Sequence, residues 1–99
     1  MPAYVVAWVA VTDPESMGRY GAAVSAVTER YGGRYLFSGP GARALEGDWQ
    51  ADGMAIIEFP THEDARRWYD SPEYAPLREL RQAAGPTSLL MTPDTAPAS

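Results

Sequence analysis

Hydrophobic and polar positions follow two periods along this chain of 99 residues. The apolar run Tyr4–Val11 is rich in β-branched and aromatic residues and predicts a strand. From Met17 to Tyr31, apolar residues recur three and four positions apart, which predicts an amphipathic helix. Both faces of the first strand are apolar, whereas helices in so small a protein cover one face of a sheet. We therefore expect a second molecule on the other face.

Start and stop signals divide the rest of the chain. A cap and a proline at Asp13-Pro14 open the first helix, and Gly32-Gly33 ends it. A second helix begins at Thr61, with Asp64 in a capping-box variant. Gly85-Pro86 ends the last helix. Strands are expected at 34–38, 54–59 and 87–92, with a short arm at 42–46.

The stretch Trp68–Tyr74 predicts the end of one helix and the start of another. Ser71 is a favourable N-cap, and Pro72 would then occupy the first helical position, where its missing N–H is harmless. Three aromatic rings fall within these seven residues, so we expect this corner to pack on an apolar surface, the face of the sheet.

The order strand, helix, strand, strand, helices, strand predicts an α+β fold. It fits a ferredoxin-like βαββαβ sandwich on an antiparallel sheet. Residues 1–92 are expected to form a single domain, because a chain of this length has room for one core. Residues 93–99, rich in proline and small residues, are expected to be a disordered tail.

Composition narrows the possible functions. A net charge of −5 and a pI near 4.6 argue against a nucleic acid partner. Without cysteine or lysine, disulfides, thiolate sites and Schiff-base chemistry are excluded. With His62 as the sole histidine, one chain cannot supply two histidine ligands to a metal, although a symmetric dimer could. No metal site and no cofactor are expected. No apolar run approaches the ~20 residues of a membrane span, so we expect a cytoplasmic protein without a membrane partner. Arginine without lysine suggests a GC-rich bacterial genome.

Several motifs together resemble a known family. They are Tyr4–Val11, Asp13-Pro14, Tyr31–Tyr35, Glu46–Trp49, Glu58–Pro60 and Trp68–Tyr74. They resemble the domain-of-unknown-function 1330 family of the dimeric α/β-barrel superfamily, over residues 3–92. The resemblance implies a homodimer in which two ferredoxin-like sheets pair face to face. The superfamily includes cofactor-free monooxygenases, isomerases, cyclases, haem-degrading enzymes and binding proteins, and the resemblance implies no settled reaction.

Three residues are candidates for catalysis. Glu58 is a carboxylate on an apolar strand, where burial would raise its pKa toward acid–base use; alternatively it pairs with Arg34 or Arg81. His62 suits a proton shuttle, although the helix terminus there disfavours its charged form and an exposed turn residue is the simpler interpretation. Arg81 is suited to clamping a carboxylate or an enolate oxygen, or else forms a surface ion pair.

Further residues are candidates for binding a substrate. Trp49, after Asp48 in a loop, is suited to stacking on a planar ligand, or else covers a dimer seam. Arg78 shares the two interpretations of Arg81. An aromatic pocket between sheet and helices would use side chains that are otherwise ordinary core residues: Tyr20, Trp68, Tyr69 and Tyr74. Pro2 is a weak candidate for the N-terminal base used by tautomerases.

The leading interpretation is a homodimer that binds a small aromatic or polyketide-like molecule. It would act without cofactor, by proton transfer in an isomerisation, cyclisation or oxygenation, with Glu58 or His62 as base and Arg81 or Tyr20 stabilising negative charge. The main alternative is a non-catalytic binding or structural dimer with a filled interior. A haem-handling role is weaker, because His62 is the only imidazole.

Overall fold

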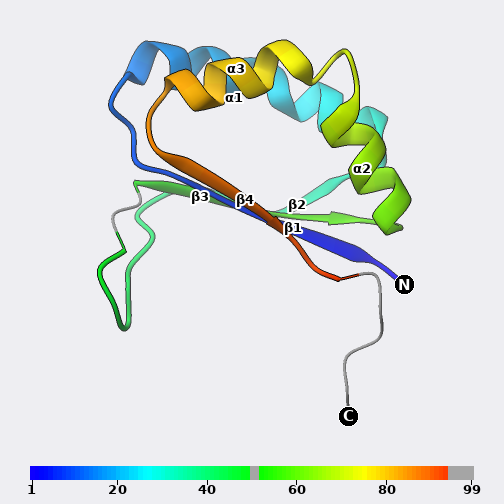
Figure 1. The fold of residues 1–99 in the computed structure, drawn as a ribbon, viewed down its shortest axis with the longest axis horizontal. Coiled ribbons are helices and arrows are strands. Elements are labelled where there is room, and N and C mark those ends of the chain that lie inside the picture. Colours follow the sequence, from blue (N-terminus) through cyan, green and yellow to red (C-terminus); the bar gives the residue numbers. More distant parts are fainter. Residues whose placement is uncertain (50–51, 94–99) are drawn as a thin grey trace.

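A four-stranded antiparallel sheet forms one layer of the protein and three helices form the other. The computed structural model describes residues 1–49 and 52–93. The strands are β1 (Ala3–Val9), β2 (Arg34–Pro40), β3 (Gly53–Phe59) and β4 (Thr87–Met91), in the order β2-β3-β1-β4. The helices are α1 (Pro14–Arg30), α2 (His62–Asp70) and α3 (Ala75–Ala83). Figure 1 shows all three helices over one face of the sheet, which confirms the predicted α+β, ferredoxin-like architecture. The predicted tail, apart from Pro93, lies outside the described residues.

The register of the central strands decides which side chains meet the helices. In β1, Val5 pairs with Ile57 of β3, and both are almost completely buried beneath the helices. Because side chains alternate along a strand, their neighbours Val6 and Ile56 point to the other face. The core consists of alternate strand residues and the inner faces of the helices: Ala3, Val5, Val24, Ile57, Phe59, Ala65, Trp68, Tyr74 and Leu77.

Helix ends follow the predicted signals. Asp13 caps α1 by accepting a hydrogen bond from the Ser16 backbone N–H, 3.3 Å away. Gly32 adopts φ +83°, the left-handed conformation expected after the helix. Thr61 caps α2 through the Asp64 N–H at 3.1 Å. Within the described part of the chain, no helix is long and apolar enough to cross a membrane.

The α2–α3 corner differs from the prediction at one point. The helix that follows Ser71 begins at Ala75, so Pro72 lies in a turn and Pro76 occupies the first turn of α3. Ser71 ends α2 instead, although its Oγ still accepts a hydrogen bond from the Tyr74 N–H at 3.1 Å, as an N-cap does. The prediction failed because a capped turn is locally the same as the first turn of a helix.

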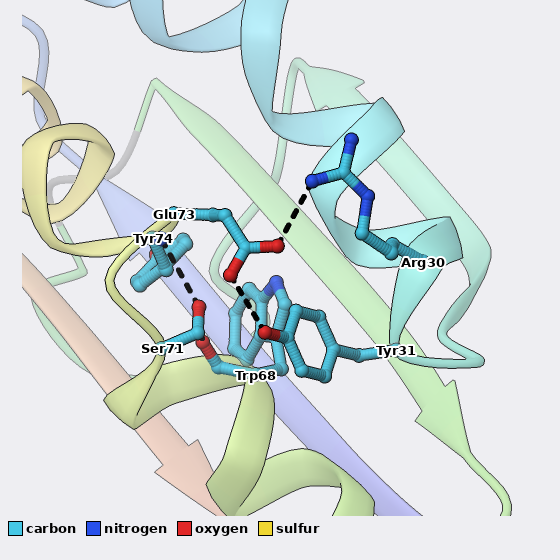
Figure 2. A network of polar contacts seen from close by, with 6 residues as sticks. All are labelled: Arg30, Tyr31, Trp68, Ser71, Glu73 and Tyr74. Atoms are coloured by element: carbon cyan, nitrogen blue, oxygen red, sulfur yellow. Dashed lines mark hydrogen bonds and ion pairs between the residues drawn. The ribbon is translucent and has the colours of Figure 1, made fainter.

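A polar network ties this corner to the end of α1 (Figure 2). The Glu73 carboxylate accepts hydrogen bonds from the Tyr31 hydroxyl at 2.8 Å and from the Arg30 guanidinium at 2.9 Å. Both contacts lower the pKa of Glu73, since each stabilises the charged carboxylate. The turn between α2 and α3 is thus anchored to a segment more than forty residues earlier in the chain.

One face of the sheet has no helix over it. We call this surface the open face, and it is mainly apolar: Tyr4, Val6, Trp8, Phe37, Met54, Ile56 and Leu90. Phe37 is 46% exposed and Leu90 is 65% exposed. The segment 41–49 extends from the end of β2 on this side of the sheet (Figure 1). The open face is the uncovered second face that the pattern of the first strand predicted.

The contact between α1 and β3 gives a test of the packing. A Cβ added at Gly33 would lie 2.6 Å from Thr28 Cγ2 and 2.8 Å from Phe59 Cε1, and both side chains are fully buried. We therefore expect Gly33→Ala to lower the free energy of unfolding by about 1–3 kcal/mol, measured by urea titration. The matched change Gly18→Ala meets no atom within 4 Å on an exposed helical position, and should raise that free energy by about 0.5–1 kcal/mol. Equal stability of the two variants would contradict this account of the packing.

Candidate functional site

A cavity of about 520 Å³ lies between the sheet and the helices. This volume is in the range of small-molecule binding sites. Its wall is mostly apolar and comes from all four strands and all three helices, with residues such as Ala7, Val9, Val24, Ile57 and Leu89. The interior is therefore not filled, unlike that expected for a purely structural dimer.

Arg81 provides the positive charge at this cavity. It lines the cavity from α3 and is only 5% exposed. Its Nε donates to the Tyr74 hydroxyl at 3.3 Å, and its Nη1 donates to Thr87 Oγ1 at 2.8 Å. Thr87 Oγ1 in turn donates to the Trp8 carbonyl at 2.8 Å. Two hydrogen bonds thus fix the guanidinium, and both acceptors are neutral.

Tyr20 and Tyr74 continue this network across the cavity wall. Their hydroxyl oxygens are 2.9 Å apart. Tyr74 is fully buried and accepts from Arg81, so its own hydrogen needs an acceptor, and among the described residues the Tyr20 oxygen is the one within reach. Tyr74 therefore donates to Tyr20. The Tyr20 hydroxyl then keeps its own hydrogen for another acceptor, and Tyr20 is one of the residues that line the cavity.

Burial keeps Tyr20 in its neutral form. Desolvation raises the pKa of Tyr20 far above its usual value, and the neighbouring Tyr74 raises it further. Burial also raises the pKa of Tyr35, another phenol in the cavity wall. Both side chains are thus suited to hydrogen bonding and not to acting as bases.

Asp52 is the carboxylate among the described residues that line the cavity. One of its oxygens accepts the Val11 N–H at 2.7 Å. Val9 pairs with Gly53, next to Asp52, on one side and with Thr87 on the other. Two strand spacings therefore separate Gly53 from Thr87, roughly 10 Å. The cavity thus has an acidic residue and a basic one at separate positions.

The predicted aromatic pocket is present only in part. Tyr20 and Trp68 line the cavity, whereas Tyr74 lies behind it in contact with the Trp68 ring, 4.4 Å between centroids. Trp68 Nε1 is buried and has no hydrogen-bond partner in the described part of the chain. Tyr69 lies on another surface, and Arg78 stacks over its ring at 4.9 Å, so the structure does not bring these two residues to the cavity.

Glu58 lies on the open face, away from the cavity. It pairs with Arg34, 2.7 Å away. This contact, with the nearby Tyr4 hydroxyl, lowers the pKa of Glu58. The expectation that burial raises this pKa is therefore wrong: the strand pattern placed Glu58 on one face of β3 but did not tell which face the helices cover.

The other predicted residues also lie outside the cavity. His62 is the first residue of α2 and does not line it; its Nε2 is buried without a hydrogen-bond partner among the described residues. Trp49 lies in the segment 41–49, where its ring meets Trp8 edge to face at 5.8 Å and lines a groove of about 480 Å³ along the open face. Asp48 is exposed beside it.

Sequence reasoning missed several polar residues of the cavity wall, among them Asp52 and Thr87. Asp52 precedes the glycine that begins β3, a pattern that also marks an ordinary turn. Thr87 opens β4, where threonine is common in any strand. Both become recognisable only when the register places them on either side of Val9. In the described residues, no group of three or more His, Asp or Glu side chains is placed to hold a metal ion.

The sequence profile of the family described as Domain of unknown function (DUF1330) matches residues 2–94. The chain belongs to the DUF1330 family. The comparison with curated protein sequences finds no match.

Solved structures similar to this DUF1330 chain share its fold. A protein of unknown function from Rhodopseudomonas palustris is 25% identical with a TM-score of 0.74, over 97% of this chain and 84% of that one. A dimeric ferredoxin-like protein of unknown function from Jannaschia sp. CCS1 has a TM-score of 0.69 at 9% identity, over 94% and 99%. SnoaB, a cofactor-independent oxygenase from Streptomyces nogalater, has a TM-score of 0.63 at 17% identity, over 99% and 94%.

The ionisation of Glu58 can be tested directly. Because Arg34 lowers the pKa of Glu58, we expect this carboxyl to titrate below the usual glutamate value in a side-chain NMR titration. Arg34→Gln should move the midpoint upward. A midpoint near neutrality in the unchanged protein would instead restore Glu58 as an acid–base candidate.

Proposed function

We propose that this DUF1330 protein is a cofactor-independent enzyme that binds a small aromatic or polyketide-like molecule in the cavity and moves a proton on it. The observation that carries the proposal is the buried Arg81, linked through the Tyr74 hydroxyl to Tyr20, in a mostly apolar cavity. Donors held in place in a desolvated site stabilise negative charge that develops on an oxygen, because they need no reorganisation as the charge forms.

Asp52 is the proton acceptor in this proposal. Removal of a proton from a carbon next to a carbonyl places the electron pair on the carbonyl oxygen, where Arg81 and Tyr20 would hold it. The proton would pass to the free oxygen of Asp52 and return at another position in an isomerisation or cyclisation. The likeness of fold to SnoaB is consistent with such chemistry.

The proposed assembly is a homodimer that buries the open face. Apolar residues such as Phe37 and Leu90 are exposed there, on a surface that no helix of the described residues covers. The similar structure from Jannaschia is described as dimeric. In this arrangement each protomer keeps its own cavity, since the cavity and the open face lie on opposite sides of the sheet.

Proton transfer can be followed without knowing the natural substrate. We expect the protein to accelerate exchange of the acidic C–H groups of 2-tetralone, an aromatic ketone, in heavy water, measured by NMR. Asp52→Asn should slow this exchange by about 10²-fold or more, because the general base is lost. Arg81→Met should slow it as well, because the enolate oxygen loses its donor.

Two variants outside the cavity serve as controls. Arg78→Met removes an arginine from the same helix, and Glu58→Gln removes the open-face carboxylate; both should exchange at the original rate. If Glu58→Gln abolished exchange while Asp52→Asn did not, the base would be Glu58, as the strand pattern suggested. Binding of aromatic molecules with no exchange in any of a panel of ketones would favour a non-catalytic binding protein.

The dimer is tested by placing a charge on the open face. Ile56 and Val6 are paired across the centre of this surface, so Ile56→Arg should convert a species of twice 10.8 kDa to a monomer in native mass spectrometry. Gln82→Arg adds the same charge at an exposed position of α3 and should leave the dimer intact. A protein that is monomeric before any substitution would overturn this assembly.

A further inference from the structure

We propose that the cavity takes its ligand as an organic monoanion, a hydrophobic carboxylate whose head group is bound by Arg81 and Tyr20. The inference deepens the function proposed above, because it names the charge of the ligand, and it rests on the same cavity being the ligand site. It states that the ligand carries a negative charge when it binds, before any proton is moved. The carbonyl of the proposed reaction would then be next to the carboxylate on the ligand, so that the N–H groups of Arg81 not used by Tyr74 and Thr87 reach both oxygens.

The first argument is the uncompensated charge of Arg81. Arginine stays ionised in proteins, and a buried charge is costly unless an opposite charge accompanies it. All six ion pairs of the described residues involve other arginines. The hydrogen-bond acceptors of Arg81, Tyr74 and Thr87, are neutral. The guanidinium therefore lacks an anion in the part of the chain that the structure describes.

The second argument concerns the one acidic residue in the same wall. Asp52 forms no ion pair with Arg81, and one of its oxygens is bound to the Val11 N–H. Asp52 is next to Gly53, and Arg81 reaches from α3 to Thr87; Gly53 and Thr87 are two strand spacings apart, roughly 10 Å. Asp52 thus leaves the charge of Arg81 to be compensated by a ligand, and it disfavours a second negative group at its own end of the cavity.

The third argument is the direction of the hydroxyl network. Arg81 donates to Tyr74, and Tyr74 donates to Tyr20, so the Tyr20 hydrogen is directed to an acceptor other than Tyr74. Arginine also carries more N–H groups than its two contacts use. An anionic oxygen is the acceptor that this pair of donors binds most strongly, because charge-assisted hydrogen bonds exceed neutral ones.

The residues that line the cavity indicate the chemistry of the ligand beyond its anionic group. Arg81 is the one basic residue among the described residues of the cavity wall, which matches a single negative charge and not a phosphate dianion. Most other lining side chains are apolar or aromatic, including Met17, Trp68 and Leu89. A carboxylate on an aromatic or aliphatic body therefore fits both parts of the cavity.

The test compares two ligands of nearly the same shape. Isothermal titration of the full chain at neutral pH with 2-naphthoate and with its neutral analogue 2-naphthamide should show at least about tenfold tighter binding of the carboxylate. In Arg81→Met this preference should disappear, with naphthamide affinity retained as evidence that the cavity is intact. Tyr20→Phe, which keeps every charge, should weaken naphthoate alone. Arg78→Met, one helical turn from Arg81, should keep the full preference.

Each outcome decides the inference separately from the enzymatic proposal. Equal affinity for the two ligands, a preference that survives Arg81→Met, or no binding of naphthoate or benzoate at millimolar concentration overturns the carboxylate site. Selective carboxylate binding without any proton exchange supports the site and contradicts the enzyme. Proton exchange on neutral ketones without a preference for the carboxylate supports the enzyme and contradicts the carboxylate site.

Discussion

The contact between the Trp68 and Tyr74 rings is the constraint on which the rest of this structure depends. The two centroids are 4.4 Å apart, and the ring centroid of Phe59 in β3 is 5.3 Å from that of Trp68. Rings this large have few ways to pack, so their contact sets how α2 and the turn after it lie on the sheet. The Glu73 network then ties that turn to the end of α1. The packing of these core residues therefore sets the positions of the helices, which the loops alone would leave adjustable.

The same core residue also organises the chemistry. Tyr74 presents its ring to Trp68 and its hydroxyl to both Tyr20 and Arg81. The polar end of the cavity is therefore supported from behind by fully buried aromatic packing, and the guanidinium is additionally held by Thr87 at the start of β4. Sites that rely on preorganised charge need such rigid support, because a donor that is free to move loses much of its effect on a developing anion.

The predictions from sequence succeeded where the signal is local. Proline and capping residues placed the start of α1, and alternation placed Ile57 and Glu58 on opposite faces of β3. Alternation does not say which face the helices cover. Without that information, Glu58 was a candidate for the active site, although it lies on the open face. The Tyr20–Tyr74 contact joins residues 54 positions apart, and no periodicity reports such a pairing. Arg81 was anticipated from its chemistry, whereas its burial and its neutral partners required the tertiary structure.

Side chains alternate between the two faces along β1 and β3, so residues next to each other in the chain contribute to two different properties of the molecule. Ala7 and Ile57 line the cavity, while Val6 and Ile56, their neighbours in the chain, belong to the open face. A substitution at one of these positions changes either the internal volume or the outer surface, and leaves the other nearly unaltered. Selectivity for small molecules and self-association are thus separately tunable traits in this fold, encoded in interleaved positions of the same two strands.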